Sequence, residues 1–569
     1  MKKSFFRNGL VCAFAYLCLL MIPQTVLAEG TKQVDPTSTD ITALYTNAAD
    51  FNFAGFGASA TNRLHIHIDD PSNQVLYIGL SGWMRTTNPI NQVCDGNATA
   101  MQTLDGTLYG DTAVYYFQIV DPSGTVVHGP FPVTQSTANT NTWALGSAGP
   151  DALFGGGYST SGNYTFNPDG LAAGDYYIEF SNSVVGGVMQ TYALDPVTGT
   201  DAVTGETTVA VKHWDLTLAT EAGAEIPGRV FSQGWYFRTP AIPLQWNNCT
   251  DGITPLFNRP FNGSVYSYSN DGFVNQINFN NSDFRGLSFI LTFNETGTGN
   301  TGDVQADRQS VLNGGALVNP DYKVFLNNPD INVFPDGTIG TVTATPMIVE
   351  CEGTYCIEVE VSERGLVEVL FDHNVVVAGE YEENTTDLLI AEFLEEDGSG
   401  GPYSICIPWN GLDGNNNPVD LNNLPRIYVR LGQGVTHFPA YDVEFASTGF
   451  NITPIRPSGG SFNGLLYYDD SNITFTPGGG EPSTALNGCS TPCHSWSNLD
   501  YGNLNTLNSW WFFDQSITTQ IEVTNCKLVA VNDTTTTPLN TPVDMPLLAN
   551  DSIIGFTIDT SSLDAIISI

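Results

Sequence analysis

The segment CSTPCHSW, residues 489–496, places two cysteines and a histidine close enough for three kinds of chemistry. Covalent haem attachment uses two cysteines separated by two residues, and three residues separate Cys489 from Cys493, so haem is disfavoured. A zinc site needs four ligands, and Cys489, Cys493 and His494 would require a fourth from Cys526 or a carboxylate. In an oxidising compartment the two thiols pair instead. We therefore expect a Cys489–Cys493 disulfide, with zinc as the alternative.

The segment LHIHI (64–68) places His65 and His67 two residues apart on a predicted strand. Alternate strand residues project from the same face of a sheet, so the two imidazoles would lie side by side. Histidine pairs of this spacing can bind a metal, with His128 or His213 as a candidate third ligand. The simpler interpretation, which we favour, is a polar outer face with the three aliphatic residues directed inward.

Turns rich in Asp and Asn supply candidate calcium ligands. The segment DGNNNP (413–418) has Asp413, Asn415 and Asn417 at the first three ligand spacings of a calcium loop, but it lacks the Gly and the acid expected at the sixth and twelfth positions. A turn is therefore the favoured interpretation here. Four further carboxylates are candidate calcium ligands of the same standing: Asp469, Asp470, Asp533 and Asp551. Calcium is the candidate cofactor, because bound cations would relieve carboxylate repulsion in an acidic chain.

Sequence signatures of catalysis are mostly missing. The chain contains no H-E-x-x-H, no G-x-S-x-G and no Gly-Lys dipeptide. A carboxylate pair for glycoside hydrolysis stays open, because 59 acidic residues offer too many combinations to rank. Tryptophans could form a carbohydrate-binding face, although most tryptophans in β-sandwiches belong to the core. The candidates are Trp83, Trp143, Trp235, Trp510 and Trp511.

The N-terminus has the parts of a secretory signal peptide. Residues 1–28 begin with Lys2, Lys3 and Arg7, continue with an apolar stretch and end in Val-Leu-Ala. We predict cleavage after Ala28. No later segment is long and apolar enough to span a bilayer, so we expect a secreted or cell-surface protein without a transmembrane segment.

Charge and cysteine content agree with export. The net charge is −41, and loss of the three cations in the signal peptide makes the mature chain more acidic still. Such acidity disfavours nucleic acid as a partner, since phosphates require Lys and Arg. Eight of the ten cysteines follow the signal peptide, and an even number in an exported chain indicates disulfides. The short-range candidates are Cys351 with Cys356 and Cys489 with Cys493.

Hydrophobic alternation predicts an all-β protein. Five segments alternate clearly and end in turn clusters: 63–69, 113–121, 174–181, 288–294 and 355–361. The best helical candidate is TTDLLIAEFLEE (385–396). Many short strands punctuated by turns indicate tandem antiparallel β-sandwiches.

Composition shifts suggest borders between regions. After the signal peptide we expect a β-sandwich over 35–245, a β-rich region over 246–326, an Ig-like β-sandwich over 327–455, and a Cys- and Trp-containing β-rich segment over 456–526. A Thr-, Pro- and Asp-rich segment covers 527–569.

Two segments resemble known families. VAVNDTTTTPLNTPVDMPLLANDS (529–552) resembles the opening of cadherin-like or fibril-type repeats in giant bacterial adhesins, and 527–569 is too short for a whole repeat, which implies a fragment of a longer protein. WNGLDGNNNPV (409–419) resembles a hairpin of Ig-like modules in secreted proteins, departing from it at Asn410 and Asn416. Together with the signal peptide, these segments resemble large exported surface proteins of Bacteroidota type, which implies adhesion or an envelope role.

The sequence thus favours a non-catalytic adhesin or envelope protein that binds an extracellular surface or a glycan through loops and sheet faces. The alternative is a secreted carbohydrate-binding protein or a glycoside hydrolase with accessory sandwiches. Two carboxylates beside an aromatic-lined cleft would favour that alternative.

Overall fold

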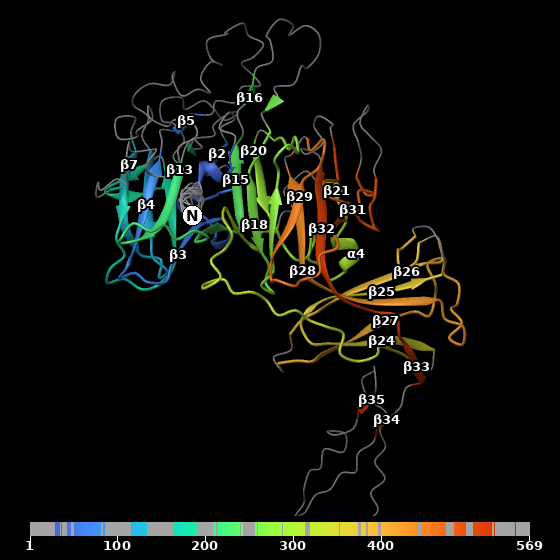
Figure 1. Ribbon diagram of the computed structural model, residues 1–569. Coiled ribbons are helices and arrows are strands. Elements are labelled where there is room, and N and C mark those ends of the chain that lie inside the picture. Colours follow the sequence, from blue (N-terminus) through green and yellow to red (C-terminus); the bar gives the residue numbers. More distant parts are fainter. Residues whose placement is uncertain are drawn as a thin grey trace, which may run out of the picture.

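The structure is a computed structural model of the 569-residue chain. It describes residues between 29 and 553, so 1–28 and 554–569 are not described; the larger gaps within this range are 86–114, 134–162, 191–208, 243–256, 474–482, 497–504 and 530–551, and shorter gaps occur elsewhere. Within the described residues the chain is nearly all β (Figure 1), as the alternation predicted. Helix is confined there to single turns: α2 (Thr31–Val34), α4 (Val304–Asp307) and the 3₁₀ turn η1 (Ala60–Asn62).

The first sandwich is built from three sheets. The nine-stranded sheet has the order β29 (Asn451–Arg456), β19 (Val274–Asn278), β18 (Ser264–Tyr268), β22 (Lys323–Phe325), β14 (Val230–Ser232), β3 (Leu64–Ile68), β9 (Gly174–Ser181), β6 (Tyr115–Val120) and β7 (Val126–Val133). A four-stranded sheet has the order β1 (Glu29–Gly30), β13 (Trp214–Thr220), β4 (Gln74–Leu80) and β8 (Thr165–Phe166).

The third sheet is the longest and joins the two halves of the molecule. Its order is β21 (Val311–Leu312), β32 (Asn505–Thr518), β28 (Arg426–Tyr441), β20 (Ser288–Thr292), β15 (Gly234–Arg238), β2 (Ala43–Thr46), β12 (Val209–Val211) and β5 (Trp83–Arg85). From β28 it branches into β25 (Gly365–Asp372) and then β26 (Leu388–Leu394). Its pairings are antiparallel throughout.

Buried side chains from these three sheets form one continuous core. Its largest members are aromatic: the indole of Trp235 lies 5.8 Å from that of Trp214 and is stacked on the Phe237 ring at 5.6 Å. Aromatic rings bury large apolar areas, so this cluster is a main source of stability for the first sandwich.

A second sandwich follows in the chain and lies below the first in Figure 1. One layer is the four-stranded sheet β27 (Tyr403–Trp409), β24 (Thr354–Val361), β23 (Met347–Cys351) and β33 (Glu522–Asn525). The other layer is β26, β25 and the first half of β28. The core between the layers includes Val359, Val369 and Val429, and the Trp409 ring lies 4.6 Å from that of Phe371.

Small two-stranded ribbons complete the described strands. They pair β10 (Val184–Val185) with β11 (Val188–Met189), β16 (Ala241–Ile242) with β17 (Phe257–Asn258), β30 (Leu465–Leu466) with β31 (Cys489–Ser490), and β34 (Leu528–Val529) with β35 (Ser552–Ile553).

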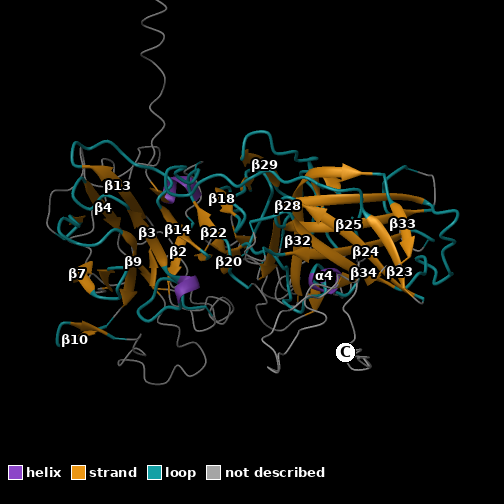
Figure 2. Ribbon diagram, turned by 90° about the horizontal axis from the view of Figure 1, so that it is seen from below, coloured by secondary structure: helices purple, strands orange, loops and turns teal. Residues whose placement is uncertain are grey.

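The long strands β28 and β32 run through both sandwiches (Figure 2). They pair from Val429–Thr518 at one end to Tyr441–Thr506 at the other, with bulges near Gly432 and Gln433. Early β28 residues belong to the second core, whereas Phe438 and Ala440 belong to the first. The two sandwiches therefore share strands and are not joined by a linker.

The five alternating segments are strands, as predicted: they correspond to β3, β6, β9, β20 and β24. The best helical candidate, 385–396, is not a helix. This segment contains β26, which pairs with β25 over seven residue pairs from Leu388–Phe371 to Leu394–Gly365. Pairing with a neighbouring strand outweighs the weak local helix preference, which is a common outcome in a β-protein.

Sheet pairing also crosses the expected region borders. The nine-stranded sheet contains strands from 35–245, 246–326 and 327–455. The second core draws its main residues from 348–431, inside the expected 327–455 region. Among the described residues, no helix has the length and hydropathy that a membrane crossing requires.

Candidate functional site

A pocket of about 480 Å³ opens where the two sandwiches meet. One wall is the outer face of β25, β28 and β32; the other is built by α4, the turn at 379–381 and the segments 463–469 and 486–487. A cavity of this volume accommodates a small ligand.

Strand alternation explains how one sheet serves both a core and a pocket. In GLVEVLFD (365–372) the side chains of Val367, Val369 and Phe371 enter the second core, whereas Glu368 and Leu370 line the pocket. Successive strand residues point to opposite faces, so each strand contributes every second residue to the pocket.

The wall formed by β25, β28 and β32 carries three charged side chains on neighbouring strands. Glu368 of β25 lies opposite Arg430 of β28, and Asp514 of β32 pairs in register with Gly432. Burial raises the pKa of the Asp514 carboxyl, the nearby Glu368 raises it further, and Arg430 partly offsets both effects.

Arg308, which follows α4, lies on the opposite wall and pairs with Glu368. Its Nη2 lies 2.9 Å from Glu368 Oε1, and both side chains are 7% exposed. Its guanidinium also lies over the Trp510 ring at 5.2 Å, within cation–π range. A buried pair of this kind fixes the wall in place, because either charge alone would be costly to bury.

Aromatic rings form the apolar part of the pocket. Tyr467 is stacked between Trp510 and Phe512, with ring centroids at 5.9 and 5.4 Å. Burial raises the pKa of Tyr467 to about 12, so its hydroxyl keeps its proton and accepts a hydrogen bond from Asn463 Nδ2 at 3.1 Å.

Several polar atoms of the pocket are not satisfied by the protein. Arg308 Nε, Arg430 Nε and Asp514 Oδ1 are buried without a hydrogen-bond partner among the described residues. Amide side chains at the rim, such as Gln309 and the exposed Asn487, add further donors and acceptors. Buried polar groups are normally paired, so this set indicates that a polar ligand or water completes the site.

Three further carboxylates of the pocket make structural contacts. Asp387 accepts hydrogen bonds from the His373 and Glu382 backbone N–H groups, at 2.8 and 3.1 Å. Asp469 accepts from Gln309 Nε2 at 3.0 Å, and Glu368 is held by Arg308. Among the carboxylates of the pocket, Asp514 is the one with a buried oxygen that has no partner among the described residues.

A second polar cluster lies on the opposite face of β32 and contains the histidine of CSTPCHSW. His494 Nδ1 is 2.6 Å from Ser509 Oγ, and Nε2 is 3.1 Å from Asp470 Oδ2. Asp470 Oδ1 also accepts from Ser310 Oγ at 2.6 Å. The Tyr468 ring covers the imidazole face at 4.0 Å. We call these residues the His494 network.

The His494 network has the residue types of a hydrolytic triad but is closed to substrate. Ser509, His494 and Asp470 are 2%, 4% and 4% exposed. Triad chemistry requires a substrate carbonyl to reach the serine oxygen. The network therefore connects β32 to the segments around 470 and 494, and its role is structural.

The disulfide expected in CSTPCHSW is present: Cys489 pairs with Cys493 next to His494. Its two sulfurs are therefore not available as zinc thiolates. The expected Cys351–Cys356 pairing is wrong. Cys356 of β24 pairs with Cys406 of β27, with Cα atoms 5.5 Å apart, and Cys351 forms a disulfide of its own. Adjacent antiparallel strands bring Cys356 and Cys406 together across 50 residues, which sequence spacing does not reveal.

The candidate calcium ligands are dispersed. Asp413 closes a hairpin turn, where its Oδ1 accepts from the Asn415 and Asn417 backbone N–H groups at 2.9 Å each. Asp469 faces the pocket and Asp470 belongs to the His494 network. Asp533 and Asp551 lie outside the described residues. No group of three or more His, Cys, Asp or Glu side chains is arranged for a metal within the described part of the chain.

His65 and His67 share the outer face of β3, with the intervening Ile66 buried. His67 Nδ1 lies 2.6 Å from Asp175 Oδ1, and His65 is stacked on Phe231 at 5.1 Å. Both therefore have protein partners.

The candidate tryptophans separate into two groups. Trp235 and Trp511 are fully buried in the first core, and Trp510 lines the pocket. The side chains of Trp83 and Trp143 lie outside the described residues.

Sequence reasoning missed Arg308, Glu368, Arg430 and Asp514. The available signal was a charged residue at an alternating position within an apolar strand, as in the segment LVEVLF around Glu368. That pattern indicates a buried charge, but it does not indicate which partner lies opposite.

Comparison with known proteins adds no relative: no family model, no curated protein and no solved structure matches this chain.

Proposed function

We propose that this protein is an exported, non-catalytic binding protein of the cell-surface adhesin type, and that it binds a short glycan segment in the pocket between the sandwiches. The observation that carries the proposal is the combination of unsatisfied guanidinium and carboxylate atoms with an aromatic wall.

Glycan chemistry fits such a wall. Sugar hydroxyls both donate and accept hydrogen bonds, so they can satisfy Arg430 Nε and Asp514 Oδ1 together. The apolar C–H faces of a sugar ring can pack against aromatic edges such as those of Trp510 and Phe512. The disulfides and the acidic composition support an extracellular setting for this binding.

A glycoside hydrolase is the second candidate, because two acids, Glu368 and Asp514, lie in an aromatic-lined pocket. The raised pKa of Asp514 suits a proton donor. Glu368, however, is held by Arg308 in a buried ion pair. We therefore favour binding without turnover.

The test is a glycan array followed by calorimetric titration of the best ligand. We expect Asn487→Ala and Asp514→Asn to weaken binding about tenfold or more, which corresponds to the loss of one or two hydrogen bonds. Asn423→Ala is the matched control, since Asn423 is equally exposed and does not line the pocket. Unchanged affinity in both pocket variants would contradict the proposal.

A reducing-sugar release assay on the same ligand distinguishes the two candidates. Binding without release supports the adhesin-type protein. Release that disappears in Asp514→Asn would establish the hydrolase instead.

A further inference from the structure

The mature N-terminus is built into the first sandwich. Cleavage after Ala28 would make Glu29 the first residue of the mature chain, and Glu29 is 1% exposed. It begins β1, in which Glu29 pairs with Leu216 and Gly30 with Asp215 of β13. The first residue after the predicted cleavage site is thus a strand residue of the core and not part of a solvated tail.

The segment after Glu29 fits its place closely. A Cβ atom on Gly30 would lie 2.2 Å from the Trp214 carbonyl oxygen, so only glycine fits there. Thr31 Oγ1 accepts a hydrogen bond from Trp214 N at 2.8 Å and donates one to Trp214 O. Val34 is fully buried. These contacts hold the Glu29 backbone nitrogen in a defined position.

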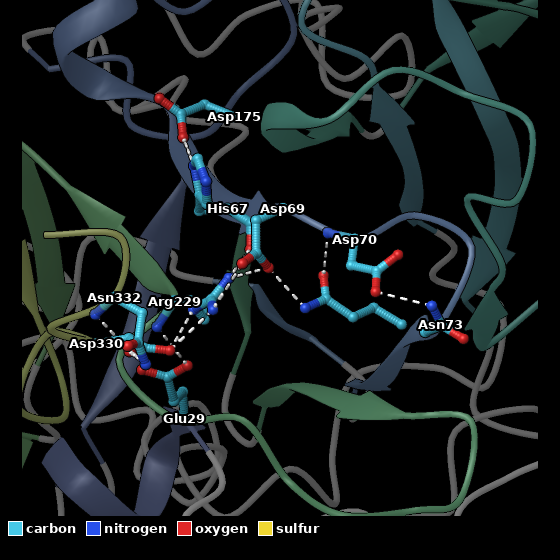
Figure 3. Close-up of polar contacts among 10 residues, drawn as sticks. Glu29, His67, Asp69, Asp70, Asn73, Asp175, Arg229, Asp330 and Asn332 are labelled. Atoms are coloured by element: carbon cyan, nitrogen blue, oxygen red, sulfur yellow. Dashed lines mark hydrogen bonds and ion pairs between the residues drawn. The ribbon is translucent and has the colours of Figure 1, made fainter.

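The Glu29 carboxylate is bound by backbone groups. It accepts hydrogen bonds from the N–H groups of Gly228, Arg229 and Val230 at 3.0, 3.2 and 3.2 Å. The Arg229 guanidinium is directed to Asp69 and Asp330 instead, at 2.6 and 2.8 Å (Figure 3). Arg229 therefore pairs with Asp69 and Asp330, and its guanidinium does not neutralise Glu29.

Asp215 is the second buried acid at this point. It is 3% exposed and accepts hydrogen bonds from Thr217 Oγ1 at 2.7 Å and from the Glu29 backbone N–H. The atom bound to the Asp215 carboxylate is therefore the nitrogen that signal-peptide removal would release.

Burial raises the pKa of Glu29 to about 8 and that of Asp215 to about 8. The Asp215 carboxylate contributes to the raised pKa of Glu29, and the Glu225 carboxylate contributes to the raised pKa of Asp215, which the Thr217 and Glu29 hydrogen bonds partly offset. Two buried acids that both have raised pKa values keep their protons unless a cation lies beside them.

We propose that removal of the signal peptide supplies that cation: the new α-ammonium group of Glu29 forms a buried ion pair with Asp215 and locks β1 into the first sandwich. A signal-peptide endopeptidase adds water across the Ala28–Glu29 peptide bond, so Ala28 leaves as a carboxylate and the Glu29 nitrogen becomes an amine. That amine takes up a proton and pairs with the Asp215 carboxylate. Maturation is thereby coupled to the stability of the fold.

The proposal predicts a difference in pH dependence. With Ala28 retained, Glu29 and Asp215 have folded pKa values above their unfolded ones, so stability falls as pH rises from about 4 towards 8. With Glu29 as first residue, the ammonium favours ionised Asp215 and removes part of this decline. Glu225, Asp69 and Asp330 keep their surroundings in both forms.

The test compares two otherwise identical proteins, one beginning at Glu29 and one beginning at Ala28, each released from a cleavable N-terminal fusion and extending to Ile569. We expect the Ala28 form to unfold about tenfold faster at pH 7.5, since it lacks the pairing charge at a buried carboxylate. The difference should shrink as the pH falls, because Asp215 is then protonated in both forms and has no charge to pair with the ammonium. Equal unfolding rates at pH 7.5 would overturn the proposal.

Asp215→Asn provides the matched variant, because an amide can still accept the Glu29 hydrogen bond but cannot pair with an ammonium. We expect it to slow folding or speed unfolding only in the form beginning at Glu29, and to abolish the difference between the two forms. If Asp215→Asn does not fold in either the Glu29 form or the Ala28 form, the pH dependence of unfolding in the two unsubstituted proteins tests the proposal instead.

The inference rests on export, which is part of the proposed function, but not on glycan binding. N-terminal sequencing of the exported protein should give Glu29; a different first residue would overturn the inference. Glycan affinity should be the same in the Glu29 and Ala28 forms, so a failure of either proposal is recognised separately.

Discussion

Ser509 and Trp510 are consecutive residues of β32, yet their side chains enter two different polar environments. Ser509 joins the His494 network, in which the histidine, aspartate and serine atoms are hydrogen-bonded to one another and covered by Tyr468. Trp510 faces the pocket, in which buried guanidinium and carboxylate atoms lack partners among the described residues.

The difference shows that residue type does not identify a site. The His494 network contains the more suggestive set of side chains, but its closure makes it a structural joint. The pocket contains an ordinary mixture of charged and aromatic residues, but some of its buried polar atoms have no partner among the described residues, so a ligand or water can bond to them. Variants in the first should therefore change stability alone, and variants in the second should change affinity.

The largest effect is expected where the pocket wall is itself structural. Arg308→Leu leaves Glu368 buried without its cation, and we expect a loss of about 3–5 kcal/mol in the free energy of unfolding. Denaturant titration measures it. The double variant Arg308→Leu/Glu368→Leu should regain most of the loss. A single variant as stable as the wild type would show that this part of the wall is not structural.

The next effect concerns the His494 network. His494→Ala removes two buried hydrogen bonds and the stacking on Tyr468, so we expect a loss of about 2–3 kcal/mol in stability with unchanged glycan affinity. His494→Asn, which retains one hydrogen bond, should lose less. Reduced affinity at full stability would instead place His494 in the binding site and remove the distinction between the two faces.

The smallest effect on stability is expected at Asp514, where the substitution should stabilise the protein and not destabilise it. Its folded pKa is raised above the unfolded value, so its ionisation destabilises the fold as pH rises from about 4 through the folded pKa. Asp514→Asn should therefore raise the melting temperature by about 1–2 °C at pH 7 and leave it unchanged near pH 3. Thermal melts at the two pH values measure this. A lower melting temperature at pH 7 would mean that the carboxylate stabilises the free protein.

Much of the fold could be predicted from alternation. RLHIHID (63–69) has the burial pattern of β3, with Leu64, Ile66 and Ile68 inside. Pairing between distant strands could not be predicted, because it depends on contacts far apart in the chain. This explains why the helical candidate 385–396 contains the strand β26, and why Cys356 pairs with Cys406.

The site could be predicted only in fragments. Trp510 was a candidate for sugar contact and does line the pocket, and Asp469 was a candidate ligand that lies at its edge. Arg308 and Glu368 are 60 residues apart and meet because α4 packs beside β26, the neighbour of β25 in the sheet. Hydrogen-bond satisfaction, which separates the pocket from the His494 network, depends on three-dimensional neighbours that no local pattern encodes.

The strands β28 and β32 also have a mechanical consequence. Both backbones are continuous across the boundary, so pulling the two sandwiches apart would require these strands to lose their pairing with the other strands of one sandwich. We therefore expect the two sandwiches to separate under load only when one of them unfolds, so the pocket beside β28 and β32 should persist until then.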